Sequence, residues 1–425
     1  MKHSFQNTNR RGFLTKAGLT AAALSLPQIA TAQKSGRKKL RIGMIGCGGR
    51  GRVVGDTAIK DGRFEIVAVA DYFKDAADGL GERFGVPSNR RYSGIECFKK
   101  MIEVGELDIA AVLSPPYFHP EQAEAAVEAG LHVWLAKPIA VDAVGVARIE
   151  AAAKRAAEKQ RCFLVDFQTR AFEHYQEAAK RVAAGDLGAL GWGEIEGTCP
   201  AFDLRAEQTG QESKLKNWLQ WKDLCGESII EFSIHSIDLA SLMIGRNPKS
   251  ATGYGRRFLL DQLPDGRKSD VRDHWLITYD YGDGFEVMFR GKRFDGHNLP
   301  DHHGLYCKLH GSLGSLETHY NGPLMLRSSV QGKSFYGDRY MVKEMGLEKP
   351  LHHIYVPGIQ RNFATFHKNI TEGDFSQATV APSVDSHYLA LLGRDAGYAD
   401  GNVVTWEETV NSKKVMEFDT SGLQV

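Results

Sequence analysis

The sequence predicts an α/β protein of two domains: an N-terminal domain with a doubly wound parallel sheet, and a C-terminal α+β domain with a large, mostly antiparallel sheet. Its 425 residues exceed what a single hydrophobic core usually serves. From residue 40 to about 165, short apolar strands alternate with helical stretches, which is typical of parallel strands joined by crossover helices. Strands joined by tight turns follow. We therefore expect the two domains at residues 33–165 and 166–425.

The composition is that of an ordinary globular protein, with 42% hydrophobic residues, 25% charged residues and a formal net charge of +1. No basic stripe points to nucleic acid, and no apolar run reaches the ~20 residues of a membrane span. The six cysteines show no C-x-x-C pairing, so we expect buried thiols. We predict no metal, no nucleic-acid partner and no membrane span in the mature protein.

The first 32 residues are expected to lie outside the fold. A twin arginine within Asn9–Lys16 precedes the mildly apolar run Ala17–Ile29, and Ala30–Ala32 forms an A-x-A cleavage pattern. This order of features resembles a twin-arginine export signal, which predicts a periplasmic or otherwise exported protein beginning near Gln33. The alternative is a disordered basic N-terminus.

The first folded element is predicted to be the strand Arg41–Gly46, followed by the turn Gly46-x-Gly48-x-x-Gly51 and a helix. In this arrangement the first glycine allows a sharp turn and the second allows close approach to a pyrophosphate. The third lets helix and strand pack closely, and the helix N-terminus offers free N–H groups to anionic oxygens. The motif predicts a dinucleotide site of the Rossmann type that includes Gly49 and Arg50.

A second predicted strand, Glu65–Ala70, ends at Asp71, 20 residues after Gly51. A carboxylate at this separation usually binds the ribose hydroxyls of the adenosine, and it would repel a 2′-phosphate, so it favours NAD over NADP. The alternative for Asp71 is a cap on the next helix. NADP stays possible because Arg50 and Arg52 could meet a 2′-phosphate.

Further strands are predicted at Ile109–Leu113, His132–Ala136 and Cys162–Phe167, with helices at Glu121–Ala129 and Val141–Gln160. Ligands of such sheets gather at the carboxyl ends of the strands. Polar groups recur there along the sequence, at Gly46, Asp71, Ser114, His119, Lys137 and Gln168. Any one of them could be a cap or a turn, but the set indicates a ligand edge.

The glycine turn, the segment Ser114-Pro-Pro-Tyr-Phe-His119 and the triplet Ala136-Lys137-Pro138 together resemble the Gfo/Idh/MocA oxidoreductases. The resemblance runs from about residue 40 to the C-terminus. It implies an NAD(P)-dependent enzyme whose Lys137 lies between nicotinamide and substrate and acts in catalysis, with cofactor contacts at Ser114, His119 and Gln168. The family usually has glutamate where this chain has Ala136. A surface lysine after a strand is the alternative for Lys137.

The C-terminal domain shows hairpin patterns. Alternating residues over Thr278–Phe289 flank a glycine-containing turn, and Tyr306–Glu317 suggests a second hairpin around Gly311–Gly314. The family resemblance implies that the resulting sheet packs one face on helices and uses the other for a homodimer or tetramer.

A second catalytic group is predicted at Glu231, His235 and Asp238, which share one face at helical spacing. A histidine flanked by carboxylates is a plausible proton acceptor with a pKa near neutral. Ion pairing on a helix face is the alternative. The resemblance implies a catalytic His235, with Glu231 and Ser233 in place of the family's usual aspartate and glycine.

Other candidates are weaker. The resemblance implies that Arg170, like Gln168, contacts nicotinamide or substrate, while Asp273–Trp275 and Asp301–His303 could reach a sugar or could be loop residues. Amphipathic helices are predicted at Arg361–Ile370 and Ser386–Asp400.

These features predict hydride transfer between a tightly bound NAD(P) and a hydroxyl of a sugar, cyclitol or glycoside. Because free cofactor is scarce outside the cytoplasm, an exported enzyme would have to hold its cofactor and regenerate it in place. Two alternatives stay open. One is a redox-neutral glycoside hydrolase or epimerase that uses transient oxidation, and the other is a non-catalytic protein that binds sugar or cofactor.

Overall fold

The computed structural model describes residues 39–199, 210–258, 269–293, 304–320, 324–337, 354–376 and 378–425. The predicted export signal and the segment Asp301–His303 lie outside the described residues. None of the described helices is long and apolar enough to cross a membrane. All six cysteines are buried and unpaired, as expected.

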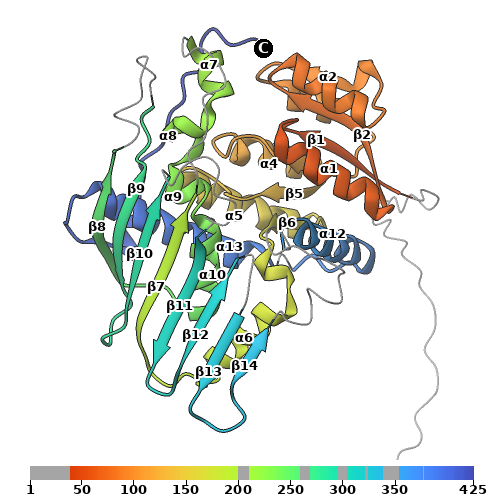
Figure 1. Cartoon of the computed structure of the whole chain (residues 1–425). Coiled ribbons are helices and arrows are strands. Elements are labelled where there is room, and N and C mark those ends of the chain that lie inside the picture. The colour runs from red at the N-terminus through yellow and green to blue at the C-terminus, as the bar shows by residue number, and fades with distance from the viewer. Residues whose placement is uncertain are drawn as a thin grey trace, which may run out of the picture. The chain divides into compact units, whose positions relative to one another are not determined.

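The N-terminal part contains a six-stranded parallel sheet in the order β3-β2-β1-β4-β5-β6, which confirms the predicted doubly wound sheet (Figure 1). Its strands are β1 (Leu40–Ile45), β2 (Phe64–Asp71), β3 (Arg91–Ser93), β4 (Ile109–Val112), β5 (His132–Ala136) and β6 (Phe163–Asp166). The chain order reverses at β1, between β2 and β4. Ligands bind beside such a reversal, at the carboxyl ends of the strands.

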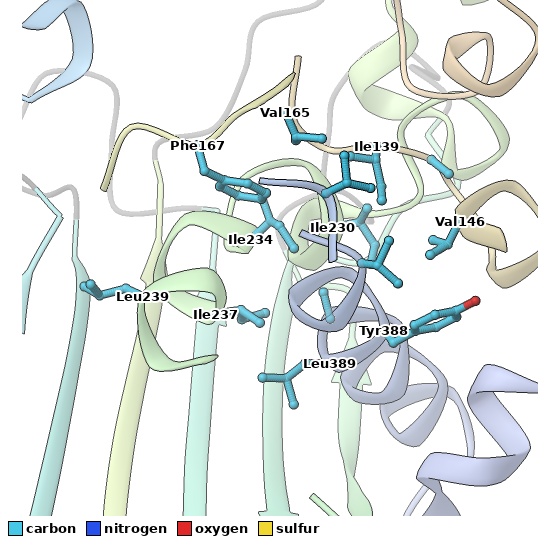
Figure 2. Close-up of a cluster of buried hydrophobic side chains, with 14 of the residues drawn as sticks. Ile139, Val146, Val165, Phe167, Ile230, Ile234, Ile237, Leu239, Tyr388 and Leu389 are labelled. Carbon is cyan, nitrogen blue, oxygen red and sulfur yellow. The ribbon is translucent and has the colours of Figure 1, made fainter. Parts of the chain in front are cut away.

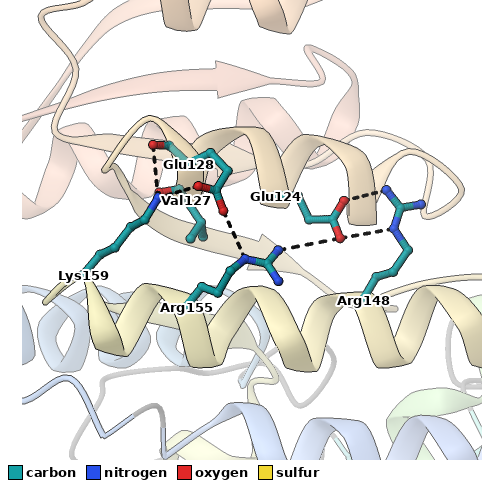
Figure 3. Close-up of polar contacts among 6 residues, drawn as sticks. All are labelled: Glu124, Val127, Glu128, Arg148, Arg155 and Lys159. Carbon is teal, nitrogen blue, oxygen red and sulfur yellow. Dashed lines mark hydrogen bonds and ion pairs between the residues drawn. The ribbon is translucent and has the colours of Figure 1, made fainter.

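Five helices connect these strands: α1 (Gly49–Asp61), α2 (Lys74–Arg83), α3 (Cys97–Glu103), α4 (His119–Glu128) and α5 (Ala143–Glu158). Asp142 caps α5, because its Oδ1 accepts the N–H of Gly145 at 2.7 Å. Ion pairs join these two helices (Figure 3): Glu124 and Glu128 on α4 pair with Arg148 and Arg155 on α5 and with Lys159 directly after it.

The second sheet has nine strands in the order β14-β13-β12-β11-β7-β10-β9-β8-β15 (Figure 1). Only β7 and β10 run parallel; the other neighbours are antiparallel, so the predicted mostly antiparallel sheet is confirmed. The strands are β7 (Leu190–Thr198), β8 (Ser250–Arg256), β9 (His274–Asp280), β10 (Glu286–Lys292), β11 (Leu305–Gly311), β12 (Gly314–His319), β13 (Leu324–Ser328), β14 (Phe335–Gly337) and β15 (Val404–Thr405). Both predicted hairpins are present, as β9–β10 and β11–β12.

One face of the second sheet is covered by helices. Its strands alternate between buried residues such as Ile195 and Phe289 and exposed residues such as Trp192 and Met288. The further helices of the chain are α6 (Glu173–Ala183), α7 (Gly210–Lys216), α8 (Lys222–Cys225), α9 (Ser228–Glu231), α10 (Ile234–Ile244), α12 (Tyr355–Glu372), α13 (Val380–Tyr398) and α14 (Trp406–Val410).

A single hydrophobic cluster runs from the first sheet through α9, α10 and α13 to the second sheet. Figure 2 shows its centre, where Val165 and Phe167 from the end of the first sheet gather with Ile230, Ile234 and Leu389. Shared burial of these side chains fixes the short helix α9 against the ligand edge of the first sheet.

Helix α12 lies late in the sequence but packs on the first sheet. Its Phe363 stacks on Trp134 of β5, with ring centroids 4.0 Å apart and an interplanar angle of 13°. Phe64 of β2 also contacts the Phe363 ring, with 4.9 Å between the ring centroids. The chain therefore returns to the first sheet after β14, before β15 adds the last strand to the second sheet. The domain limits of 33–165 and 166–425 stay a prediction.

Candidate active site

The glycine turn after β1 has the shape that a dinucleotide requires. Gly46 has a φ of +100°, and a Cβ there would lie 2.6 Å from the Leu113 carbonyl group. A Cβ at Gly51 would lie 2.3 Å from the Gly46 oxygen, whereas Gly48 and Gly49 border open space. Since α1 begins at Gly49, its first N–H groups are available to an anion in that space. The turn fits a pyrophosphate.

Asp71 ends β2 beside this turn. Its Oδ2 accepts the Cys47 N–H at 2.7 Å, and its Oδ1 accepts the Phe73 N–H at 2.9 Å. Burial raises the pKa of Asp71, and these two hydrogen bonds oppose the shift. They hold the carboxylate where a ribose contact would be made, and that contact stays a prediction.

Ser114 and His119 lie after β4. The Ser114 hydroxyl donates to Gln122 Oε1 at 2.6 Å. His119 is buried, with Nδ1 2.8 Å from the Pro138 oxygen and Nε2 2.7 Å from the Ser114 oxygen. Burial lowers the pKa of His119 to about 4. Neither ring nitrogen is left for a cofactor, so His119 instead ties the loop after β4 to the loop after β5.

Lys137, at the end of β5, meets Glu231 at the end of α9. Its ammonium group donates to the Glu231 backbone oxygen at 2.6 Å and to Oε1 at 3.1 Å. Burial raises the pKa of Glu231, and the charge of Lys137 opposes that shift. The structure thus brings together two predicted catalytic residues that are 94 positions apart in the sequence.

His235 lies beside this pair but does not have the environment that its spacing predicts. Its ring centroid is 4.5 Å from that of Tyr320, and Glu231 bonds Lys137 rather than the imidazole. Burial, followed by the charges of Lys137 and Arg50, lowers the pKa of His235 well below its usual value. The expected pKa near neutral is therefore wrong, and His235 is neutral at neutral pH.

The predicted shared helix face is also wrong. Helices α9 and α10 are separate, so Glu231 does not lie on the same helix as His235 and Asp238. Asp238 is fully buried and bonds Arg170 Nε at 2.7 Å and the Ser386 hydroxyl at 2.7 Å. Arg170 is thus used in an internal ion pair, which does not support its predicted contact with nicotinamide or substrate.

Arg50 turns away from Asp71. It pairs with Asp166 at the end of β6, and its guanidinium lies 4.8 Å from the centre of the Tyr355 ring. Burial disfavours the Arg50 charge, but Asp166, Tyr355 and Tyr320 together outweigh burial and raise the guanidinium pKa. Because β2 and β6 lie on opposite sides of β1, this geometry does not support an Arg50 contact with a 2′-phosphate. The exposed Arg52 keeps that possibility open.

Gln168 is fully buried beneath the site. Its Nε2 donates to the Asp166 backbone oxygen at 3.0 Å, and its Oε1 accepts the Tyr320 hydroxyl at 2.7 Å. Asn362 of α12 donates to Asp166 Oδ1 at 2.7 Å. Sequence reasoning missed Asp166, Tyr320 and Asn362. Only Asp166 carried a signal, since it stands at the carboxyl end of a predicted strand.

Two of the weaker sugar candidates, Asp273 and Trp275, are buried. Trp275 is buried, and its Nε1 donates to the Ser228 hydroxyl at 3.0 Å. Asp273 is buried and accepts the Phe258 N–H. Within the described parts of the chain, no group of three or more His, Cys, Asp or Glu side chains could hold a metal.

Three buried polar atoms around Lys137 have no hydrogen-bond partner among the described residues: Glu231 Oε2, His235 Nδ1 and Arg50 Nη1. The three groups are close enough for the Arg50 charge to shift the pKa values of both Glu231 and His235. Because an unpaired buried polar atom is costly, their convergence points to a polar ligand. The site can bind a hydroxyl group, stabilise a negative charge on its oxygen and accept its proton.

A dinucleotide-binding sheet with a lysine, a carboxylate and a neutral histidine at its carboxyl edge defines a nicotinamide-dependent oxidoreductase. The family model "Oxidoreductase family, NAD-binding Rossmann fold" matches residues 40–167, and the model "GFO/IDH/MocA C-terminal domain" matches residues 175–317. The chain belongs to the Gfo/Idh/MocA family, and its N-terminal part is an NAD-binding Rossmann domain.

Similar proteins cover nearly the whole chain. An inositol 2-dehydrogenase of Rhizobium meliloti (strain 1021) is 21% identical over 372 residues, which are 84% of this chain and 95% of the relative. An oxidoreductase from Agrobacterium radiobacter, solved with NAD+, L-tartaric acid and magnesium, has a TM-score of 0.66 at 16% identity and covers 87% of this chain and 99% of its own. The myo-inositol 2-dehydrogenase of Lactobacillus plantarum has a TM-score of 0.65 at 21% identity, with shares of 87% and 99%. At these identities the likeness of the structures establishes the fold.

Proposed function

We propose that the chain transfers hydride between NAD(P) and the carbon of a secondary hydroxyl group in a cyclitol or sugar. One observation carries the proposal: Lys137, Glu231 and His235 converge at the ligand edge of an NAD-binding sheet and leave buried polar atoms unpaired. The inositol 2-dehydrogenase that matches 84% of this chain supports a polyhydroxylated ring as substrate. When bound, the nicotinamide supplies the acceptor or donor of the hydride.

The residues of the chain would divide the remaining work. The ammonium group of Lys137 would bind the reacting hydroxyl and stabilise negative charge on its oxygen. Glu231 restrains Lys137 because its backbone oxygen and its carboxylate each accept a hydrogen bond from the ammonium group. His235 is neutral and has an unpartnered Nδ1, so it can accept the hydroxyl proton in the tautomer that leaves this nitrogen unprotonated.

The test measures turnover by the parent and by Lys137→Ala with NAD and a panel of cyclitols and aldoses. The absorbance of NADH reports the reaction. We expect kcat to fall by at least about 100-fold, since the substitution removes the charge nearest the developing alkoxide. NADH binding, measured by fluorescence, should persist. Lys159→Ala, at an exposed residue directly after α5, is the matched control and should turn over like the parent. Equal turnover by Lys137→Ala and the parent would refute the assignment, and a parent without turnover on any substrate would favour the non-catalytic alternative.

We infer that the chain is exported by the twin-arginine route and acts in the periplasm or beyond. The arginine pair, the apolar run and the Ala30–Ala32 pattern support this. Export would favour a retained cofactor that is regenerated in place, by a second substrate or by return of the hydride to the same molecule. The second of these covers epimerase and glycoside hydrolase chemistry. N-terminal sequencing of the protein from the periplasm should begin near Gln33; a retained Met1 would contradict export.

We infer also that the chain forms a homo-oligomer through the open face of the second sheet. Large apolar side chains are exposed on the adjacent strands β7, β10 and β9, including Trp192, Met288 and Leu276, whose side chain is 56% exposed. An apolar area of this kind is typical of an interaction surface. Sedimentation equilibrium should give a dimer or tetramer, and Leu276→Glu should weaken it; a monomeric parent would exclude this assembly.

A further inference from the structure

The C-terminal segment crosses back to the ligand edge of the first sheet. We call Met416–Val425 the C-terminal strap. Its Met416 N–H donates to Asp142 Oδ2 at 2.8 Å, and at the other end the Gln424 oxygen accepts the Ile95 N–H at 2.7 Å. Figure 1 shows the C-terminus near α2 and α7, and Gln211 of α7 donates to Asp419 at 3.1 Å.

The C-terminal end of the strap contacts the loop that directly follows β2. The Gln424 N–H donates to the Tyr72 hydroxyl at 3.3 Å, and Tyr72 follows Asp71. The Gly94 N–H donates to the Tyr72 backbone oxygen at 3.2 Å. A Cβ at Gly94 would lie 2.8 Å from the carbonyl carbon of Val425, so the absence of a side chain at Gly94 leaves room for Val425.

The middle of the strap holds the loop that follows β4. Phe418 is only 4% exposed, and its ring lies 5.9 Å from that of Tyr117 and 6.3 Å from that of Phe118, in edge-on contacts. Phe418 and Leu423 belong to a small hydrophobic cluster that also includes Phe73. The strap therefore joins, through one cluster, the loop after Asp71 to the loop after Ser114.

These two loops border the glycine turn at which the cofactor would bind. They follow β2 and β4, the two strands that flank β1 and its glycine turn. The strap cannot leave without separating Phe418 from Tyr117 and Phe118, and the loop after β4 cannot swing outward alone without breaking the same contacts. Outward movement of the loop after β2 would break the hydrogen bond between Gln424 and Tyr72. An element that must open locally before a ligand departs slows that departure.

We propose that the C-terminal strap retains the dinucleotide by holding the loops after β2 and β4 together, so that it sets the dissociation rate of the cofactor. The proposal rests on NAD binding at the glycine turn and is independent of the substrate. It gives an exported enzyme of this family a structural means of keeping its cofactor.

The experiment measures NADH dissociation from the purified full chain, by displacement with excess NAD+ and loss of protein-bound NADH fluorescence. A chain ending at Val415, which lacks the whole strap, should release NADH about tenfold faster or more, since affinity changes fall mainly on dissociation. Phe418→Ala should raise the rate by a smaller factor. Val415→Ala is the matched control, because Val415 is 56% exposed and precedes the strap; its rate should equal that of the parent.

Thermal unfolding of the cofactor-free proteins separates retention from a purely structural role. If Phe418→Ala lowers Tm while NADH dissociation stays at the parent rate, the strap supports the fold only and the proposal is wrong. Tyr72→Phe provides a second variant that keeps the packing and removes one hydrogen bond to Gln424, and it should release NADH slightly faster. A parent chain that binds no NADH would overturn the cofactor site itself, together with the strap.

Discussion

The molecule contains two sets of ion pairs between carboxylates and basic side chains, one exposed on the surface and one buried at the ligand edge. On the surface, α4 and α5 are joined by carboxylates and basic groups such as Glu128 and Arg155, whose side chains are 56% and 37% exposed (Figure 3). At the ligand edge, Asp166 is fully buried beneath Arg50, and Lys137 meets Glu231 with side chains 13% and 17% exposed. Only the second set leaves buried polar atoms unpaired. The difference indicates that the surface pairs serve helix packing, whereas the buried pairs are arranged for a ligand.

The largest effect is expected from breaking the buried pair of Arg50 and Asp166. Arg50→Ala should lower the free energy of unfolding by about 3 kcal/mol or more, because it leaves a buried carboxylate without its cation. Asn362 would remain as a hydrogen-bond donor to Asp166. Urea unfolding of the cofactor-free protein gives the value.

The control for this prediction is the double variant Arg50→Met with Asp166→Asn, which removes both charges and keeps similar volume. It should recover most of the lost stability, since replacing both members of a buried pair is often close to neutral. A single variant as stable as the double one would mean that the pairing of Asp166 with Arg50 does not stabilise the fold.

A smaller effect, which sharpens the comparison, comes from Glu227 at the start of α9. Glu227 is fully buried, and its backbone has a φ of +107°. Its carboxylate accepts hydrogen bonds from the Tyr398 hydroxyl and from the Arg272 N–H. Burial raises the pKa of Glu227 to about 7, and those hydrogen bonds oppose the shift. Glu227 is therefore expected to be protonated in the folded state below neutral pH.

The sign of the pH dependence follows from that pKa. Between about 4.3, the value in the unfolded chain, and about 7, the folded state binds more protons, so the Glu227 contribution to stability falls as pH rises. The loss is on the order of 3 kcal/mol. Urea unfolding at about pH 5 and pH 8 should show this fall in the parent and not in Glu227→Gln. An equal fall in both proteins would assign the pH dependence to other groups.

Local patterns predicted the parts of the fold that depend on neighbours in sequence. The apolar runs before Gly46 and Asp71 marked β1 and β2, and the turn near Gly284 marked the β9–β10 hairpin. The break between α9 and α10 was not predictable in this way. Helical spacing continues through Ser233, but a Cβ at Gly197 of β7 would lie 2.3 Å from the Ser233 hydroxyl. This close approach of a distant strand has no local signature.

The sequence predicted which residues form the candidate site better than it predicted the contacts between them. Lys137 and Glu231 were both named from the sequence, but their pairing depends on how α9 lies across the end of β5. The direction of the Arg50 side chain depends on Asp166, a carboxylate 116 positions later in the sequence. Asp238, which was expected to pair with His235, instead accepts a hydrogen bond from Arg170. Long-range pairing of this kind is set by packing, which neither spacing nor composition reveals.

The smallest effect is expected on the surface, from Arg155→Ala. Arg155 Nε lies 3.1 Å from Glu128, which also pairs with Lys159 at 2.6 Å, so one partner remains after the substitution. Because both groups are solvated and screened, Tm should change by about 2 °C or less, and the change should vanish at high salt. Arg148→Ala, which removes a neighbouring pair with Glu124 at 2.6 Å, is the matched variant and should behave alike. A shift in Tm as large as that of Arg50→Ala would show that burial does not separate the two sets of ion pairs.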